Sequence, residues 1–266
     1  MKVAVIGGGT MGEAIIKSIL RKRLAAKADI SVCDVIPRRR DYFKSKYGLK
    51  AVSDNAAVAR AADVIILAVK PQDMVATMEG IAGSLKSQLV ISIAAGVTLD
   101  TLCGKLNYRK VVRAMPNTPA QVGRGMTAWT AAGQVGEKEQ ATARAILLAM
   151  GEEQFFADEK YIDMATAISG SGPAYVFLFI EALIDAGVHI GLPRDMARKL
   201  VVETIAGSAE AMKKTAKHPA ELRNMVTSPG GTTAEALYKL EVGGMRSLLI
   251  SAAEAAYNKA KALGAK

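Results

Sequence analysis

Short apolar runs alternate with longer segments of helical pattern over the first part of the chain, up to about residue 157. The clearest of these runs are rich in Val, Ile and Leu: Val3–Ile6, Ile30–Cys33, Val64–Val69, Leu89–Ala94 and Val111–Ala114. Weaker ones follow at Ala128–Thr130 and Gln154–Phe156. Several runs are continuously apolar, as strands are when both faces of a parallel sheet are buried. The pattern predicts a doubly wound α/β domain over residues 1–157.

Helical patterns replace the strand signals after about residue 158. The segments that share this pattern are Tyr161–Ser169, Ala174–Ala186, Arg194–Thr215, Pro219–Thr227, Thr233–Val242 and Met245–Leu263. The helices that begin at Arg194 and Met245 are rich in Ala. Small side chains let helices approach closely, as in a bundle or a subunit interface. We therefore expect an all-α domain over residues 158–266.

Composition narrows the class of protein. The chain has 266 residues, which is long for one domain and sufficient for two. Its formal net charge of +10 would suit nucleic acid, but anionic cofactors and substrates are attracted by the same charge. The basic residues are scattered apart from Arg21–Arg23 and Arg38–Arg40, and no motif of aromatic and basic residues accompanies them. We expect a small-molecule partner and no nucleic acid.

Cysteine usage and apolar runs indicate the compartment. Cys33 and Cys103 are distant in sequence and form no C-x-x-C, which is typical of a reduced cytosol and gives no sign of a metal site. The N-terminus enters a strand directly, without the pattern of a signal peptide. The apolar run Ala174–Ile180 is too short to span a bilayer. The sequence predicts a cytoplasmic protein with no metal and no membrane partner.

A glycine-rich motif lies between the first predicted strand and the helical segment after it. In this G-x-G-x-x-G, Gly7 permits a tight turn, Gly9 lets backbone approach a pyrophosphate, and Gly12 allows close packing of helix on strand. The helix N-terminus adds free N–H groups and the positive end of its dipole. The motif predicts a dinucleotide site at Gly7, Gly8, Gly9, Thr10, Met11 and Gly12. The alternative is a glycine-rich turn that binds nothing.

The end of the second predicted strand carries two conflicting signals about the cofactor. Asp34 stands where an acid would hydrogen-bond the 2′-hydroxyl of the adenosine ribose, which favours NAD(H). The residues Arg38–Arg40 follow at once, and Arg38 with its neighbours could hold the 2′-phosphate of NADP(H). Asp34 is also a candidate turn residue before Pro37. The sequence leaves NADP(H) and NAD(H) both open.

Three further predicted strands end in segments that suit the edge of a ligand site, because ligands of open α/β sheets bind outside the carboxyl ends of the strands. In Ala68–Gln72, Lys70 could meet a cofactor or substrate anion, or be an ordinary surface lysine. Ser92–Gly96 ends in small residues, which let a nicotinamide ribose lie close. Arg113–Pro119 contains two prolines, and a stiff loop of this kind forms a site wall or serves packing alone.

These motifs, with others further along the chain, resemble pyrroline-5-carboxylate reductase. The matching stretches are Ile6–Gly12, Ala68–Gln72, Arg113–Pro119, Ser169–Tyr175, His218–Pro219, Val226–Leu237 and Gly243–Ile250. The resemblance runs nearly from end to end. Many dehydrogenases share the first motif, whereas the block around Ser228–Thr233 (SPGGTT) is far more specific to this family.

The resemblance implies an NAD(P)H-dependent reduction of Δ1-pyrroline-5-carboxylate to L-proline, the last step of proline biosynthesis. It also implies a Rossmann domain followed by a helical domain that forms a homodimer by interlocking helices, with rings of dimers such as a decamer as larger assemblies. By position, the cofactor contacts would be Asn55, Ala68, Val69, Lys70, Pro71 and Ala95. The substrate loop would consist of Ser228, Gly230, Gly231, Thr232 and Thr233.

The SPGGTT segment admits two compatible interpretations. Gly230 and Gly231 expose backbone N–H groups beside a helix start, which together suit a substrate carboxylate. The spacing of Thr232 and Glu235 by itself favours a capping box, with Thr232 as the N-cap. The resemblance favours the substrate site. We predict that Thr232 caps the helix and that the Thr233 hydroxyl is the catalytic group that touches the imine nitrogen.

Three other features have structural alternatives. Ser169–Pro173 would break a helix so that the next begins at Pro173, and it could also bring backbone near the nicotinamide. His189 lies at a helix end between apolar neighbours and is expected to be structural. His218 precedes Pro219 and is expected to cap a helix and not to catalyse.

Two other functions fit the same outline. A β-hydroxyacid dehydrogenase would have a similar first half but would need a catalytic Lys in the first long helix after it. Neither Tyr161–Ser169 nor Ala174–Gly187 contains a Lys, which argues against that enzyme. A dinucleotide-sensing protein without catalysis would not need the SPGGTT loop.

Overall fold

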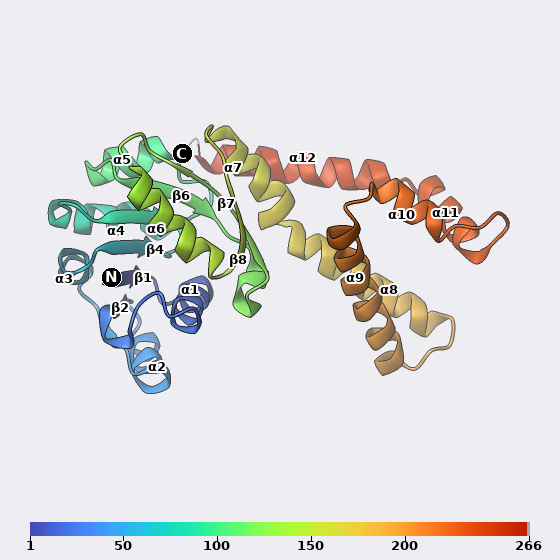
Figure 1. The fold of residues 1–266 in the computed structure, drawn as a ribbon, viewed down its shortest axis with the longest axis horizontal. Coiled ribbons are helices and arrows are strands. Elements are labelled where there is room, and N and C mark those ends of the chain that lie inside the picture. The colour runs from blue at the N-terminus through green and yellow to red at the C-terminus, as the bar shows by residue number, and fades with distance from the viewer. Residues whose placement is uncertain (265–266) are drawn as a thin grey trace. The chain divides into compact units, whose positions relative to one another are not determined.

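The computed structural model of the chain describes residues 1–264. Its internal contacts divide it into two compact units: Met1–Pro173 together with the residues from Ala255 onward, and Ala174–Glu254. The first unit contains the sheet, and the second is made of helices (Figure 1). The α/β class of the first part and the helical class of the second are confirmed.

The sheet has eight strands in the order β3-β2-β1-β4-β5-β6-β7-β8. Strands β1 to β6 are parallel, β7 is antiparallel to β6, and β8 is parallel to β7. The strands are β1 (Val3–Ile6), β2 (Ile30–Cys33), β3 (Lys50–Val52), β4 (Val64–Leu67), β5 (Leu89–Ser92), β6 (Val111–Met115), β7 (Gly125–Ala131) and β8 (Gly151–Phe155). The strand order reverses between β1 and β4, which is where doubly wound sheets bind ligands.

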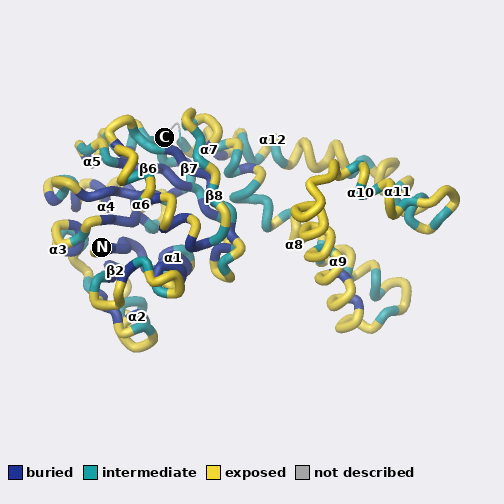
Figure 2. Tube along the Cα trace, in the orientation of Figure 1, coloured by how far each residue is buried: buried dark blue, intermediate teal, exposed yellow. Residues whose placement is uncertain are grey.

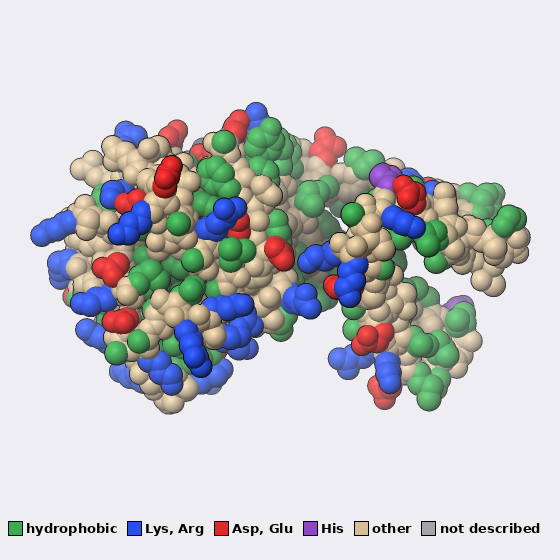
Figure 3. Space-filling model, viewed as in Figure 1, with side chains coloured by type: hydrophobic (Ala, Val, Ile, Leu, Met, Phe, Trp, Pro, Cys, Tyr) green, Lys and Arg blue, Asp and Glu red, His purple; other side chains and the backbone are tan. Residues whose placement is uncertain are grey.

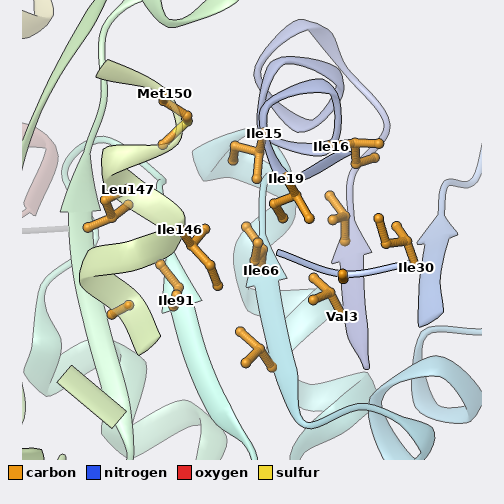
Figure 4. Close-up of a cluster of buried hydrophobic side chains, with 14 of the residues drawn as sticks. Val3, Ile15, Ile16, Ile19, Ile30, Ile66, Ile91, Ile146, Leu147 and Met150 are labelled. Atoms are coloured by element: carbon orange, nitrogen blue, oxygen red, sulfur yellow. The ribbon is translucent and has the colours of Figure 1, made fainter. Parts of the chain in front are cut away.

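Six helices cover the two faces of this sheet: α1 (Thr10–Arg21), α2 (Pro37–Tyr47), α3 (Asn55–Ala61), α4 (Met74–Ile81), α5 (Leu99–Leu106) and α6 (Glu137–Leu148). Alternate residues of β1 serve the two faces, since side chains alternate along a strand. Val3 and Val5 belong to one buried cluster with side chains of α1, α2 and α6, and Figure 4 labels Val3 together with residues of α1 and α6 from this cluster. Ala4 and Ile6 pack with α3, α4 and α5. Burial on both faces explains the continuous apolar runs.

One helical stretch runs from Lys160 to His189. It consists of α7 (Lys160–Ala165), a π-helical turn (Thr166–Gly170) and α8 (Gly172–His189). The Ser171 N–H donates to the Thr166 carbonyl at 2.8 Å, which is the bond of a π turn. The prediction that a new helix begins at Pro173 is confirmed to within one residue, since α7 ends at Ala165, Ser171 is a bend and α8 begins at Gly172. Pro173 lies in the first turn of α8, where its missing N–H costs nothing.

The remaining helices are α9 (Arg194–Thr215), α10 (Pro219–Met225), α11 (Thr232–Val242) and α12 (Met245–Gly264). None of the side chains of α8, α10 or α11 is fully buried, and Figure 2 shows these helices mostly in the colours of exposed and intermediate residues. The run Ala174–Ile180, expected to be too short for a membrane, is part of the 30-residue stretch Lys160–His189. That stretch is long and apolar enough to cross a bilayer by length and composition alone. Ile162 and Ala167 in this stretch are buried, but its large apolar side chains from Val176 to Phe179 are exposed and call for a partner surface.

Candidate functional site

A cleft of about 610 Å³ lies at the carboxyl ends of β1, β2 and β4. Half of the residues predicted to bind a cofactor line it: Gly7, Gly9, Asp34, Asn55, Ala68, Val69 and Lys70. The exposed apolar side chains of Val35 and Ile36 also line it, as does Arg39. The cleft sits at the reversal of strand order, so the fold places it where a dinucleotide binds in related architectures.

The glycine-rich loop is shaped by close backbone contacts. Gly7 has φ +104°, and its N–H donates to the Cys33 carbonyl at 2.8 Å. A Cβ on Gly12 would lie 2.1 Å from the Gly7 carbonyl oxygen, so only glycine lets α1 begin this close to the loop. Gly9, in contrast, has nothing within 4 Å of the position that a Cβ would take, and it is the N-cap of α1. The N-terminal end of α1 is therefore open toward the cleft at Gly9.

The Asp34 carboxylate links β2 to this loop. Its Oδ2 accepts the Gly8 N–H at 2.7 Å, and its Oδ1 accepts the Ile36 N–H at 2.8 Å. The sequence offered a ribose-binding acid or a turn residue as alternatives. Asp34 makes the hydrogen bond of a turn residue and also lines the cleft, so both interpretations stay open.

Arg39 is the arginine of the Arg38–Arg40 run that lines the cleft. Its Nε donates to the Gly8 carbonyl at 2.6 Å, and its Nη2 lies 3.2 Å from Glu13 Oε2. Its guanidinium also lies 4.7 Å from the centre of the Tyr42 ring. Arg38, the predicted cofactor contact, is exposed, does not line the cleft, and has no side-chain hydrogen bond or ion pair within residues 1–264. Neighbours in one helical turn differ in direction, and the sequence alone did not tell which one faces inward.

The Glu13 carboxylate on α1 accepts hydrogen bonds from four side chains of α2 and so holds the two helices together. Partial burial by itself would raise the pKa of Glu13, but hydrogen bonds from Tyr42, Tyr47, Lys46 and Arg39 outweigh it and lower the pKa to about 2. The two tyrosine hydroxyls lie 2.6 and 2.8 Å from Glu13 Oε1. Figure 3 shows Lys and Arg side chains gathered over this part of the molecule. This negative centre therefore organises a strongly basic surface beside the cleft.

The other predicted cofactor residues do not line the cleft. Thr10 and Met11 begin α1, Pro71 opens a short 3₁₀ turn after Lys70, and Ala95 lies on the loop after β5. Cys33 does line the cleft, but burial above all, with the carboxylates of Asp54 and Asp34, raises the pKa of its thiol to about 11. The thiol is neutral at physiological pH and packs as an apolar group.

Three polar contacts fasten β6 and the loop after it to Glu159 and to the helical stretch that follows it. Arg113 is 2% exposed, with Nη1 2.7 Å from Glu159 Oε1 and Nη2 2.5 Å from Asp163 Oδ1. Asn117 Nδ2 donates to the Ser169 carbonyl at 3.1 Å, in the π turn. The two prolines of Arg113–Pro119 predicted a stiff loop that forms a site wall or serves packing alone. These contacts could not be predicted, because their partners are about 50 positions away in the sequence.

The SPGGTT segment lies in the second unit, at the start of α11. The N-cap is Gly231, not Thr232, and no side chain caps the helix. The capping-box prediction is therefore wrong, because the helix begins one residue earlier than the spacing implied. Gly230 has φ +68°, and the Gly231 N–H donates to the Ser228 carbonyl at 3.1 Å, which forms a tight turn before the helix. Within the described residues, the hydroxyls of Ser228, Thr232 and Thr233 have no hydrogen-bond partner.

The histidines have structural surroundings. His218 is the N-cap of α10, and its Nδ1 accepts the Ala220 N–H at 3.2 Å, as expected for a cap. His189 is the last residue of α8. In residues 1–264, no group of three or more His, Cys, Asp or Glu side chains is placed to hold a metal ion.

Two family models match the chain. One, described as pyrroline-5-carboxylate reductase dimerisation, matches residues 159–263 and so includes the whole apolar helical stretch Lys160–His189. The other, described as NADP oxidoreductase, coenzyme F420-dependent, matches residues 2–96, which contain the cleft.

Full-length relatives give the same result. The pyrroline-5-carboxylate reductase of Synechocystis sp. is 43% identical over 266 residues, covering 100% of this chain and 99% of the relative. That of Escherichia coli is 41% identical over 264 residues, covering 98% of each. The crystal structure of Plasmodium falciparum pyrroline carboxylate reductase with NADP bound has a TM-score of 0.91 at 36% identity, covering 99% of this chain and 98% of that one. A prephenate dehydrogenase of Aquifex aeolicus, with a TM-score of 0.57 at 14% identity over 92% of this chain and 98% of that one, shares the fold alone.

Proposed function

This chain belongs to the pyrroline-5-carboxylate reductase family, and we propose how its residues carry out the reaction of that family, the reduction of Δ1-pyrroline-5-carboxylate to L-proline with NAD(P)H. The enzyme is an oxidoreductase of proline biosynthesis that binds NAD(P)H. The observation that carries the assignment of the substrate site is the SPGGTT turn, whose three hydroxyls have no hydrogen-bond partner in the described chain, at a helix start without a side-chain cap.

The residues around the cleft fit a dinucleotide. The start of α1 is open at Gly9, so its N–H groups and dipole are available to the pyrophosphate. Asp34, Val35, Ile36 and Arg39 would hold the adenosine end. Asn55, Ala68, Val69, Lys70, Pro71 and Ala95 would line the rest of the cofactor's path. The bound cofactor supplies the hydride, and the protein holds and orients it.

The SPGGTT turn would anchor the substrate carboxylate. Gly230 and Gly231 present backbone N–H groups without side chains, and the positive end of the α11 dipole points the same way. Ser228 and Thr232 would add hydroxyl donors. An anchored carboxylate fixes the ring, so that its imine carbon is held in one orientation for hydride transfer.

Thr233 would touch the imine nitrogen. When a hydride adds to the imine carbon, the nitrogen gains an electron pair and takes a proton to become the secondary amine of proline. A hydroxyl that hydrogen-bonds this nitrogen orients the imine and stabilises the charge that changes there. The side chain of Thr233 is half-buried at the first turn of α11, which restricts its rotamers more than those of the exposed Thr232.

We propose that the oligomer is a homodimer with interlocked C-terminal helices, and that dimers assemble further into a decamer. The match of residues 159–263 to the dimerisation family supports an oligomer. The exposed side chains of Phe177, Leu178 and Phe179 on α8 also need a covering surface. Native mass spectrometry would give the number of subunits. We also propose a cytoplasmic location, supported by two cysteines that form no disulfide.

The test of the reaction is spectrophotometric. Purified enzyme should oxidise NADH or NADPH only when Δ1-pyrroline-5-carboxylate is added, with L-proline as the product. Absence of turnover with either cofactor would contradict the proposed reaction.

A further inference from the structure

The carboxylate of Asp34 is held at the end of the cleft where the adenosine ribose of a dinucleotide lies in this fold. Backbone N–H groups on both sides fix it, one from Gly8 at 2.7 Å and one from Ile36 at 2.8 Å. A carboxylate has about four acceptor positions, so two remain for a ligand. The side chain is therefore pre-organised as a hydrogen-bond acceptor and as a fixed negative charge.

The arginines that could oppose this charge are already engaged or lie elsewhere. Arg39 donates to the Gly8 carbonyl and to Glu13. Arg40 donates to the carbonyls of Asp34 and Val35 at 2.8 and 2.9 Å. Arg38 is exposed and does not line the cleft. A 2′-phosphate would meet the Asp34 carboxylate, and the positive charge of Arg39 is already shared with the Glu13 carboxylate.

We propose that this cleft selects NADH over NADPH, with Asp34 as the residue that determines the choice. The 2′-hydroxyl of NADH donates to a free position of the carboxylate, whereas the phosphate of NADPH carries negative charge to the same place. Repulsion between like charges a few ångströms apart near a protein surface is worth about tenfold or more in affinity. The proposal rests on the proposed function only in that the cleft binds a dinucleotide, and it does not depend on the substrate.

The test measures binding without substrate. Dissociation constants for NADH and NADPH are obtained by cofactor fluorescence, and those for the oxidised forms by calorimetry, at one fixed ionic strength. The native enzyme should bind NADH at least about tenfold more tightly than NADPH. Equal affinities, or tighter binding of NADPH, would overturn the proposal. Because no substrate is present, a failure of the reductase reaction leaves this result intact, and the converse also holds.

Two variants separate the charge from the fold. Asp34→Asn keeps an acceptor for the Gly8 N–H and removes the charge, so affinity for NADPH should rise and the preference should shrink to about threefold or less. Arg38→Ala is the matched control, and it should leave both dissociation constants within about twofold. Circular dichroism and the melting temperature verify that both variants are folded. A preference that survives in Asp34→Asn, or NADPH binding that is lost in Arg38→Ala, would overturn the assignment.

Discussion

Arg113 on β6 allows a test of how strongly its ion pairs hold α7 against the sheet. Its side chain is 2% exposed and makes ion pairs with Glu159 and Asp163. Glu159 Oε1 also accepts the Leu99 N–H at 2.7 Å, at the start of α5. The substitution Arg113→Met replaces the guanidinium by an unbranched apolar side chain and leaves two carboxylates without their cation.

The expected loss follows from burial. Removing one partner of a fully buried ion pair costs about 3–5 kcal/mol, because the remaining charge is uncompensated. The side chains of Glu159 and Asp163 are 28% and 16% exposed, so water compensates part of their charge. We therefore expect Arg113→Met to lower the free energy of unfolding by about 3 kcal/mol, the lower end of that range. Arg113→Lys keeps the charge but loses the forked geometry and should cost about 1.5 kcal/mol.

The assay is denaturant unfolding followed by tryptophan fluorescence. Trp129 is the only tryptophan, is 2% exposed, and pairs with Ala114, the neighbour of Arg113, across β6 and β7. It therefore reports unfolding of the unit that contains the ion pairs. Lys105→Met is the control: it breaks an exposed pair with Glu79 at 3.6 Å and should change the free energy by no more than about 0.5 kcal/mol. A loss of less than about 1 kcal/mol for Arg113→Met would refute the reasoning.

Three further predictions concern the sites. Thr233→Ala should lower turnover by about 10–100-fold while the cofactor dissociation constant stays within about twofold, and an equal loss of both would indicate a structural role instead. Gly12→Ala should weaken cofactor binding by more than about tenfold in titrations, because its Cβ would lie 2.1 Å from the Gly7 oxygen; unchanged binding would contradict this packing. The lowered pKa of Glu13, about 2 against an ordinary 4.5, stabilises the fold above pH 4.5, and this contribution is lost as the pH falls toward 2. Acid unfolding of Glu13→Gln should therefore be less steep over that window, and equal slopes would contradict it.

The strands that lie inside the sheet could be predicted from the sequence because burial on both faces leaves continuous apolar runs. The runs Val3–Ile6 and Ile30–Cys33 match β1 and β2 as the structure has them. Strand β3 was missed because it is a short edge strand that begins with the exposed Lys50. The run Val64–Val69 was predicted too long, since β4 ends at Leu67 and the next residues turn along the cleft.

The site could be predicted where it depends on local sequence and not where it depends on distant partners. The glycine motif could be predicted because its turn at Gly7, its helix start at Gly9 and its close packing at Gly12 all lie within six consecutive residues. Arg39 lines the cleft and Arg38 does not. Which of the two faces inward depends on Glu13, 26 positions away, and on the direction in which α2 starts. The predicted N-cap of α11 was one residue too late. The N-cap is Gly231, which has the extended backbone of an N-cap, and a glycine has no side chain from which a capping pattern can be recognised.

The segments that lead into and out of the helical unit are both fastened near the carboxyl edge of the sheet. Arg113 and Asn117 hold the incoming stretch at Asp163 and Ser169. The outgoing helix α12 ends against the loop after β5, where a Cβ on Gly96 would lie 2.6 Å from the Cβ of Leu263. That loop carries Ala95, a predicted cofactor contact. Position 96 requires glycine for two reasons: a Cβ would clash with Leu263, and the backbone has φ +74°. The contact of Leu263 with Gly96 thus fixes the loop that carries Ala95, and substitutions of Leu263 should alter cofactor affinity without changing a predicted cofactor-binding residue.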